Sequence, residues 1–409
     1  MKVLFAVSSW AGHWFPMVPL AWALQSAGHE VRVLCAPSQE PAASAAGLTP
    51  VPALHGMDMV FLSRLRYQWD AQAGNWPYPW LPLHPVTGEE MRSLDEFDFG
   101  RYVTEHTADT FGALVRSFDA AAAFTKAWRP DLVVHDPLST EGQLAAAIAK
   151  VPAVVHLWGL TGTHEPPESN VSLVPEYPAG TFAKWKVRDL NRDRVTHVID
   201  PCPAELAPPI GDARRLPVRY VAYNGPGESP TWLLDPPARP RVCLVWGTST
   251  TAMSGPRSFA LPRIVEAVAD LDAEIVMTAT AEDLARIGPL PDSVRVLERF
   301  PLNLLLPTCS AVVHHGGAGC LMTALAAGVP QVAVTYAIEQ ELNGVRVAAA
   351  GAGAQLRGDL ADVDGIRAAV TEVLGKPGYA EAADRLAGGV AARPSPAELA
   401  EQLVEMAGG

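Results

Sequence analysis

The sequence predicts an α/β protein built from two doubly wound domains, each a parallel sheet covered by helices. Apolar runs of strand length alternate with helix-like stretches, which is the pattern of such sheets. The alternation begins twice, at residue 3 and again at residue 242, on either side of a Pro/Gly-rich stretch at 223–240. The length of 409 residues suits two domains better than one.

The first half opens with a continuous apolar run at residues 3–7, as expected of a strand buried on both faces of a parallel sheet. Pro16 favours the start of a helix that runs to about Ala27, and Gly28 ends it. The expected elements that follow are a strand at 31–35, a strand at 132–135, a helix at 142–149 and a strand at 153–157.

The second half repeats the alternation. The last helix has Ser395 as its predicted N-terminal cap. The expected strands are 242–246, 275–277, 294–297, 311–313 and 331–335, and the expected helices are 262–270, 302–306 and 394–406.

Two long segments, 55–115 and 158–200, interrupt the alternation and are rich in aromatic residues. Long insertions in such folds usually lie over a site, and aromatic density predicts walls for a flat or greasy ligand. The alternative, that these aromatics pack small cores of their own, stays open.

Composition narrows the classes of function. The net charge is −13 and no Lys/Arg run occurs, which argues against nucleic acid and anionic membranes as partners. The five cysteines form no C-x-x-C, which fits a reduced, cytoplasmic protein. No apolar run reaches transmembrane length, and residues 1–7 are too short for a signal peptide, so a first strand is expected there.

Residues 312–328, VVHHGGAGCLMTALAAG, predict a strand, a glycine turn and a helix that ends at Gly328. Glycines let backbone N–H groups approach a ligand, and a helix N-terminus presents unpaired N–H groups and positive dipole. His315 at the entrance can add a hydrogen bond to a phosphate oxygen. The stretch therefore predicts a diphosphate site, with a plain glycine turn as the alternative.

Several motifs together resemble one family. They are Gly12-His13-x-x-Pro16, residues 129–136 (RPDLVVHD), residues 301–309 (PLNLLLPTC), residues 314–319 (HHGGAG) and residues 324–331 (ALAAGVPQ). With these, essentially the whole chain resembles the GT-B glycosyltransferases, and more narrowly the bacterial enzymes that glycosylate polyketides, macrolides and related antibiotics.

The resemblance implies two Rossmann-like domains that face a cleft, with the last helix crossing back to the N-terminal domain. The expected ranges are an acceptor-binding domain at 1–222, a linker at 223–240, a nucleotide-sugar-binding domain at 241–392 and the crossing helix at 393–409.

The resemblance also implies an inverting reaction in which a base activates the acceptor hydroxyl. His13 matches the family's base, and Asp136 matches its orienting carboxylate, although Asp70, Asp95 or Asp98 could take that role instead. The residues expected to contact the acceptor are Trp10, Trp76, Trp80 and Trp158.

The donor site is implied in the second half. The expected diphosphate contacts are His315, Gly316, Gly317, Gly319, Cys320, Thr248 and Ser249. Arg299 and Phe300 are expected at the nucleobase, and Glu339 and Gln340 at the sugar. The chain departs from the family pattern at Cys320, where threonine is usual, at Glu339, where aspartate is common, and at Arg299-Phe300, where a tryptophan often stacks.

The resemblance implies that the leaving diphosphate is neutralised without a metal. No cofactor is expected, because the donor, a nucleoside diphosphate sugar with dTDP favoured, is a co-substrate. Asp270-Leu271-Asp272 matches a D-x-D metal signature, but its place between a helix and a strand predicts a solvated turn. The expected partners are the donor and a small-molecule aglycone, and the protein is expected to be a monomer or homodimer. Two other functions remain open: a GT-B sugar-nucleotide epimerase, and a non-catalytic helper of a partner transferase.

Overall fold

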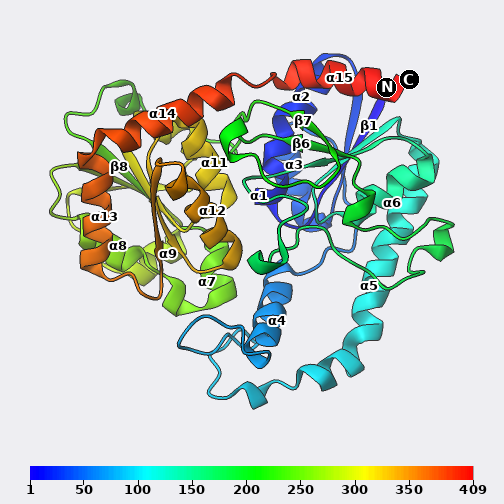
Figure 1. Ribbon diagram of the computed structural model, residues 1–409, viewed down its shortest axis with the longest axis horizontal. Coiled ribbons are helices and arrows are strands. Elements are labelled where there is room, and N and C mark those ends of the chain that lie inside the picture. Colours follow the sequence, from blue (N-terminus) through cyan, green and yellow to red (C-terminus); the bar gives the residue numbers. More distant parts are fainter. Residues whose placement is uncertain (409) are drawn as a thin grey trace. The chain divides into compact units, whose positions relative to one another are not determined.

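The computed structural model describes residues 1–408, apart from the side chains of Thr107, Ala108 and Thr248. The chain forms two compact units (Figure 1). Unit 1 comprises Met1–Met57, Ala108–Pro226 and the chain from Gly389, and unit 2 comprises Asp58–Thr107 and Gly227–Gly388. Each unit contains one parallel sheet with helices on its faces, so the fold class predicted from the sequence is confirmed.

The sheet of unit 1 has seven parallel strands in the order β3-β2-β1-β4-β5-β6-β7. Side chains of β1 alternate between two hydrophobic clusters, Val3 and Phe5 on one face and Leu4 and Ala6 on the other, which explains its uninterrupted apolar run. The strands are β1 Lys2–Ala6, β2 Glu30–Leu34, β3 Pro50–Val51, β4 Leu132–His135, β5 Ala153–His156, β6 His197–Asp200 and β7 Arg214–Pro217.

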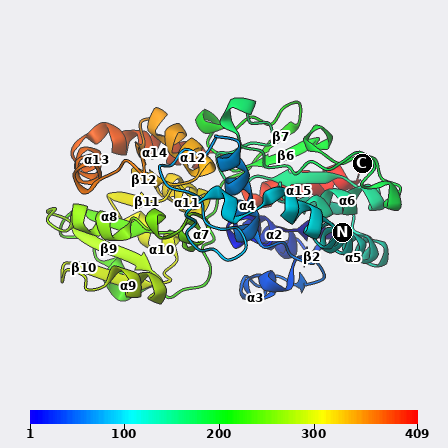
Figure 2. The ribbon, with the colours of Figure 1, turned by 90° about the horizontal axis from the view of Figure 1, so that it is seen from below.

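The last helix of the chain packs in unit 1. Leu399, Ala400 and Leu403 of α15 (Pro396–Gly408) join the core of β1, and the helix lies beside α2 (Figure 2). The other helices that lie wholly or partly in unit 1 are α1 Ala11–Trp14, α2 Val18–Ser26, α3 Glu40–Ala45, α5 Phe99–Trp128, α6 Thr140–Ala149 and the end of α14 (Pro377–Ala391).

The sheet of unit 2 has six parallel strands in the order β10-β9-β8-β11-β12-β13, with α8 and α13 on one face and α10 and α11 on the other. The strands are β8 Arg241–Val245, β9 Glu274–Ala279, β10 Val294–Glu298, β11 Ala311–His314, β12 Gln331–Thr335 and β13 Gly353–Arg357. The helices are α4 Met59–Gln72, α7 Thr248–Ser254, α8 Leu261–Val268, α9 Ala281–Ile287, α10 Leu302–Leu305, α11 Ala318–Ala327, α12 Ile338–Ala349, α13 Val363–Gly375 and α14 Pro377–Ala391.

The segment Asp58–Thr107 belongs to unit 2, whereas the sequence prediction placed it in the domain of residues 1–222. Polar contacts explain the difference. Arg64 of α4 donates a hydrogen bond to the Ala252 carbonyl of α7 at 2.8 Å, and Arg357 donates to the Pro77 carbonyl at 3.0 Å. Carbonyls near a helix end lack partners within the helix, so a guanidinium is a suitable donor for them.

The 30-residue helix α5 begins at Phe99, within the insertion expected at 55–115, and continues to Trp128. Throughout residues 1–408, none of the helices combines the length and apolar character needed to span a bilayer.

Candidate functional site

The side chain of His314 stabilises the glycine turn after β11. This buried imidazole accepts a hydrogen bond from the Gly316 N–H at 2.9 Å through Nδ1, and its Nε2 lies 2.8 Å from the Gln331 side-chain oxygen. Gly316 has φ of +84°, a region that favours glycine, and a Cβ there would come within 2.8 Å of the Gln340 carbonyl oxygen. The turn is therefore fixed in one shape.

His315 is neutral and presents one N–H at this turn. The Gly247 N–H donates to its Nδ1 at 3.1 Å, so the proton of the neutral ring resides on Nε2. Burial lowers the pKa of His315 to about 3. A Cβ at Gly317 would lie 2.2 Å from Nε2, so this nitrogen stands directly over the N-cap residue of α11.

The first turn of α11 is open to a ligand. Its N-cap, Gly317, provides no side-chain hydrogen bond to the helix, and a Cβ at Gly319 would meet nothing within 4 Å. Helix N-terminal amides without a cap bind anions well. Cys320 is half-buried in this turn, and burial raises its pKa to about 12, so the thiol stays protonated.

The other predicted phosphate contacts lie on α7, which begins directly after Gly247. Ser249 is half-buried in the first turn of α7. The side chain of Thr248 lies outside the part of the chain that the structure describes.

The predicted sugar residues begin α12. Gln340 is buried, and both ends of its amide are used inside the unit: Oε1 accepts from the Tyr336 N–H at 3.0 Å, and Nε2 donates to Thr250 Oγ1 at 3.1 Å. These two hydrogen bonds anchor the start of α12, and the contact of Gln340 to sugar hydroxyls stays a prediction. Glu339 is half-buried. Burial of Tyr67 is the main cause that raises the pKa of this tyrosine to about 12, and the negative charge of Glu339 adds to the shift.

The predicted nucleobase residues follow β10, at the edge of the sheet. Arg299 is exposed and has φ of 48°. Phe300 is half-buried against the hydrophobic cluster of α10 and α11.

His13 lies in unit 1, on the short helix α1 that follows β1. Its ring stacks on Trp158, with centroids 4.0 Å apart and planes 12° apart, and Trp10 lies 5.5 Å away. Its Nδ1 is 3.1 Å from Ser8 Oγ. Burial lowers the pKa of His13 to about 3. The structure therefore brings together the predicted base and two of the four predicted acceptor contacts.

Asp136, the carboxylate predicted to orient His13, is joined to it through Ser8. Its carboxylate accepts hydrogen bonds from the Ser8 N–H at 2.6 Å, the Leu138 N–H at 2.9 Å and the Ser139 N–H at 3.2 Å. Ser8 stands between the two because β1 and β4 are adjacent and Ser8 lies two residues beyond the end of β1. Burial raises the pKa of Asp136 to about 6, although these hydrogen bonds oppose the shift.

The alternative carboxylates belong to the other unit. Asp70, Asp95 and Asp98 all fall within Asp58–Thr107 of unit 2, and Asp70 pairs with Arg66 at 3.0 Å.

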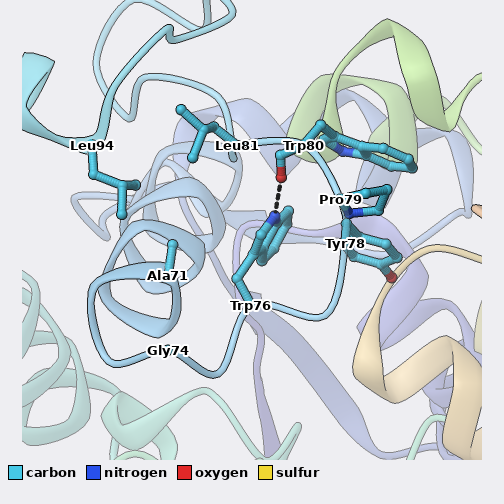
Figure 3. A pocket seen from close by; sticks show the side chains of 8 residues that line it. All are labelled: Ala71, Gly74, Trp76, Tyr78, Pro79, Trp80, Leu81 and Leu94. Atoms are coloured by element: carbon cyan, nitrogen blue, oxygen red, sulfur yellow. Dashed lines mark hydrogen bonds between the residues drawn. The ribbon is translucent and has the colours of Figure 1, made fainter.

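The remaining acceptor candidates, Trp76 and Trp80, lie in unit 2, not in the unit of His13. The Trp76 indole N–H donates to the Trp80 carbonyl at 2.6 Å, and Tyr78 stacks on Trp80 at 5.2 Å (Figure 3). They border a hollow of about 240 Å³ beside the C-terminal end of α4. The hollow is lined by Ala71, Gly74, Trp76, Tyr78, Pro79, Trp80, Leu81 and Leu94.

Sequence reasoning missed three residues that position the site: Ser8, Gly247 and His314. Each was visible as a polar residue or glycine at the end of a predicted strand, where ligands bind in such sheets. Their partners lie elsewhere in the chain or in the turn itself, so no local pattern marked the contacts.

The D-x-D sequence has no metal-like arrangement. The carboxylates of Asp270 and Asp272 are exposed and face different arginines, Arg367 at 3.8 Å and Arg239 at 3.2 Å. Among the residues that the structure describes, no three His, Cys, Asp or Glu side chains are grouped to hold a metal ion.

Comparisons with known proteins match the whole chain. Residues 22–247 and 262–406 match the N-terminal and C-terminal domains of the family "erythromycin biosynthesis protein CIII-like". The chain is 34% identical to 3-alpha-mycarosylerythronolide B desosaminyl transferase of Saccharopolyspora erythraea, over 100% of this chain and 99% of that protein. It is 37% identical to L-demethylnoviosyl transferase of Streptomyces niveus, over 98% and 97%. Spinosyn rhamnosyltransferase SpnG, solved in complex with thymidine diphosphate, is similar in structure, with a TM-score of 0.77, 29% identity and coverage of 99% and 100%.

Proposed function

The chain belongs to the erythromycin biosynthesis protein CIII-like family of glycosyltransferases, and from this premise we propose the reaction that it catalyses. It transfers a deoxysugar from a dTDP donor to a hydroxyl group of a hydrophobic natural-product aglycone, with inversion at the anomeric carbon. The relatives named above are sugar transferases, and SpnG was solved with thymidine diphosphate, which supports the class of donor.

The observation that carries the proposal is the pairing of His315 with the N-terminus of α11. A neutral imidazole directs its Nε2–H over Gly317, where the helix amides have no side-chain cap. Diphosphate is the leaving group of the reaction, and its charge increases as the bond to the sugar breaks. Donors already aimed at that charge stabilise the transition state.

His13 supplies the base. As the acceptor oxygen forms its bond to the anomeric carbon, the hydroxyl proton moves to the imidazole. The bond from that carbon to the phosphate oxygen breaks, and its electron pair leaves with dTDP. The stacked Trp158 and the neighbouring Trp10 give the base an apolar surround that suits a flat, hydrophobic acceptor.

The proposed reaction needs no metal ion, because the amides of α11 and His315 neutralise the leaving group. Glu339, half-buried at the start of α12, is the proposed contact to sugar hydroxyls, and Gln340 fixes the start of that helix.

The test is a panel of dTDP-sugars and UDP-sugars, each incubated with and without macrolide, anthracycline and aminocoumarin aglycones. The expected result is release of dTDP that depends on an aglycone, together with an aglycone mass increased by one sugar residue. Conversion of the donor to another sugar nucleotide without aglycone would instead indicate an epimerase. Activity found only as stimulation of a separate transferase would indicate a helper. His13→Ala serves as the inactive control.

A further inference from the structure

Ser8 joins two groups that the reaction uses. Its Oγ lies 3.1 Å from His13 Nδ1, and its N–H donates to Asp136 Oδ2 at 2.6 Å. The Ser8 hydroxyl is also hydrogen-bonded to the Asp136 carboxylate, one of the contacts that hold down the pKa of Asp136 against burial. The three side chains form a continuous line from β4 to the loop after β1.

Proton placement in this line follows from the inventory of donors. An ionised carboxylate only accepts, so the hydroxyl of Ser8 donates its proton to Asp136. The serine oxygen then accepts a hydrogen bond, and the donor that faces it is the Nδ1–H of His13. A neutral imidazole has a single N–H, so Nε2 of His13 retains a lone pair.

We propose that Ser8 is a positioning residue that couples the charge of Asp136 to His13, fixes the Nδ1–H form of the ring and leaves Nε2 as the base. The inference rests on the proposed function, because it assigns the proton path of that reaction.

The coupling answers a difficulty in the site. Burial lowers the pKa of His13 to about 3, so its imidazolium is costly to form as the ring takes the acceptor proton. Asp136 is completely buried and its pKa is about 6, so it is ionised at neutral pH. Through Ser8, that negative charge stabilises the positive ring at the moment of transfer.

Ser8 also has a structural role, and the two roles can be separated. The contact from its main-chain N–H to Asp136 survives replacement of the side chain. Ser8→Ala therefore removes the coupling and keeps the tie between β1 and β4. Ser8→Thr retains a hydroxyl, and the adjacent Ser9→Ala is the matched control.

The experiment measures kcat, the donor KM and the Kd for dTDP in these variants and in Asp136→Asn. Ser8→Ala should lower kcat at least about tenfold, which is a part of the roughly 10²–10⁴-fold that general-base catalysis contributes as a whole. The Kd for dTDP should stay unchanged, Ser8→Thr should recover most of the rate, and Ser9→Ala should match wild type. Ser8→Ala combined with Asp136→Asn should be no slower than Asp136→Asn alone, because both changes break one path.

A spectroscopic measurement needs no variant of Ser8. In ¹⁵N-labelled wild-type protein, with His13→Ala used to assign the signals, His13 should show a protonated Nδ1 and an unprotonated Nε2.

A protonated Nε2 would overturn the inference even if Ser8→Ala failed to fold. A Ser8→Ala rate within twofold of wild type would also overturn it. So would a double variant whose loss of kcat equals the product of the losses in Ser8→Ala and Asp136→Asn. Failure of the proposed function would look different: His13→Ala would keep its activity, or no aglycone would be glycosylated.

Discussion

Removing the imidazole of His315 should weaken the binding of dTDP by about 10- to 150-fold. Its Nδ1 is occupied by the Gly247 N–H, so the group lost toward the ligand is the single Nε2–H. A hydrogen bond to a charged phosphate oxygen contributes about 1.5–3 kcal/mol, and each 1.4 kcal/mol is tenfold in affinity.

Isothermal titration of His315→Ala with dTDP measures this loss, and His106→Ala, an exposed histidine on α5, is the control. Thermal melts of both variants check that they are folded. Gly317→Val should be at least as damaging, because its Cβ would stand 2.2 Å from the Nε2 of His315. Because burial holds the pKa of His315 near 3, the ring stays neutral and its contribution should be constant from pH 6 to 9. Binding of dTDP to His315→Ala within twofold of wild type would refute the reasoning.

The activity should fall as pH drops below about 6, because burial raises the pKa of Asp136 to about that value and the coupling needs its ionised form. Burial raises the pKa of the neighbouring Glu141 to about 7, so this group also titrates in the same pH range. If the pH–rate profile of Asp136→Asn kept the same loss of activity at low pH, that loss would belong to a group other than Asp136. EDTA should leave the rate of transfer unchanged, and recovery by Mg²⁺ of a lost rate would contradict metal-free catalysis. Arg215→Ala should destabilise unit 1 in urea denaturation by less than the about 3–5 kcal/mol lost when a buried charge keeps no partner, since the buried Asp200 carboxylate loses Arg215 at 2.5 Å but retains Arg393 at 3.8 Å and the Cys202 N–H at 2.9 Å; a loss below about 1 kcal/mol would show that the Arg215 pair adds little.

The strand, turn and helix around His315 were predictable because their signals are local. Val312 and Val313 precede the turn, and helix formers follow it. Gly328 ends the helix in the left-handed conformation, with φ of 68°, that favours glycine. The hydrogen bond that sets the proton of His315 comes from Gly247, 68 residues away, and no local pattern in the sequence specifies it.

The segment at Asp58–Thr107 was harder to predict, because its place depends on contacts between distant residues. In α4, Gln68 and Asp70 are buried while Trp69 is 47% exposed, which reverses the pattern that hydrophobicity predicts. Arg64 finds its acceptor on α7, 188 residues later in the chain. Alternation of apolar and polar residues cannot report such pairings, so the aromatic residues of this segment were assigned to the other domain.

Asp136 illustrates an intermediate case. Its type and its place at the end of β4 were readable, and the adjacency of β1 and β4 follows from the doubly wound fold. What the sequence does not show is that a serine, Ser8, lies between Asp136 and His13. Ser8 stands in the same loop as His13, yet serine is common in loops and its role emerges only once both partners are placed.

The two site histidines show how one residue type serves opposite purposes. Burial lowers the pKa of His13 and of His315 to about 3, so both rings are neutral and charge does not distinguish them. What differs is the group that faces Nδ1. A backbone N–H at Gly247 can only donate, which leaves Nε2 of His315 as a donor suited to a diphosphate. A serine hydroxyl that donates to a carboxylate offers its oxygen as an acceptor, which leaves Nε2 of His13 as a base. The division of labour therefore resides in the neighbours, and exchanging a neighbour should change the role of a histidine without touching the ring itself.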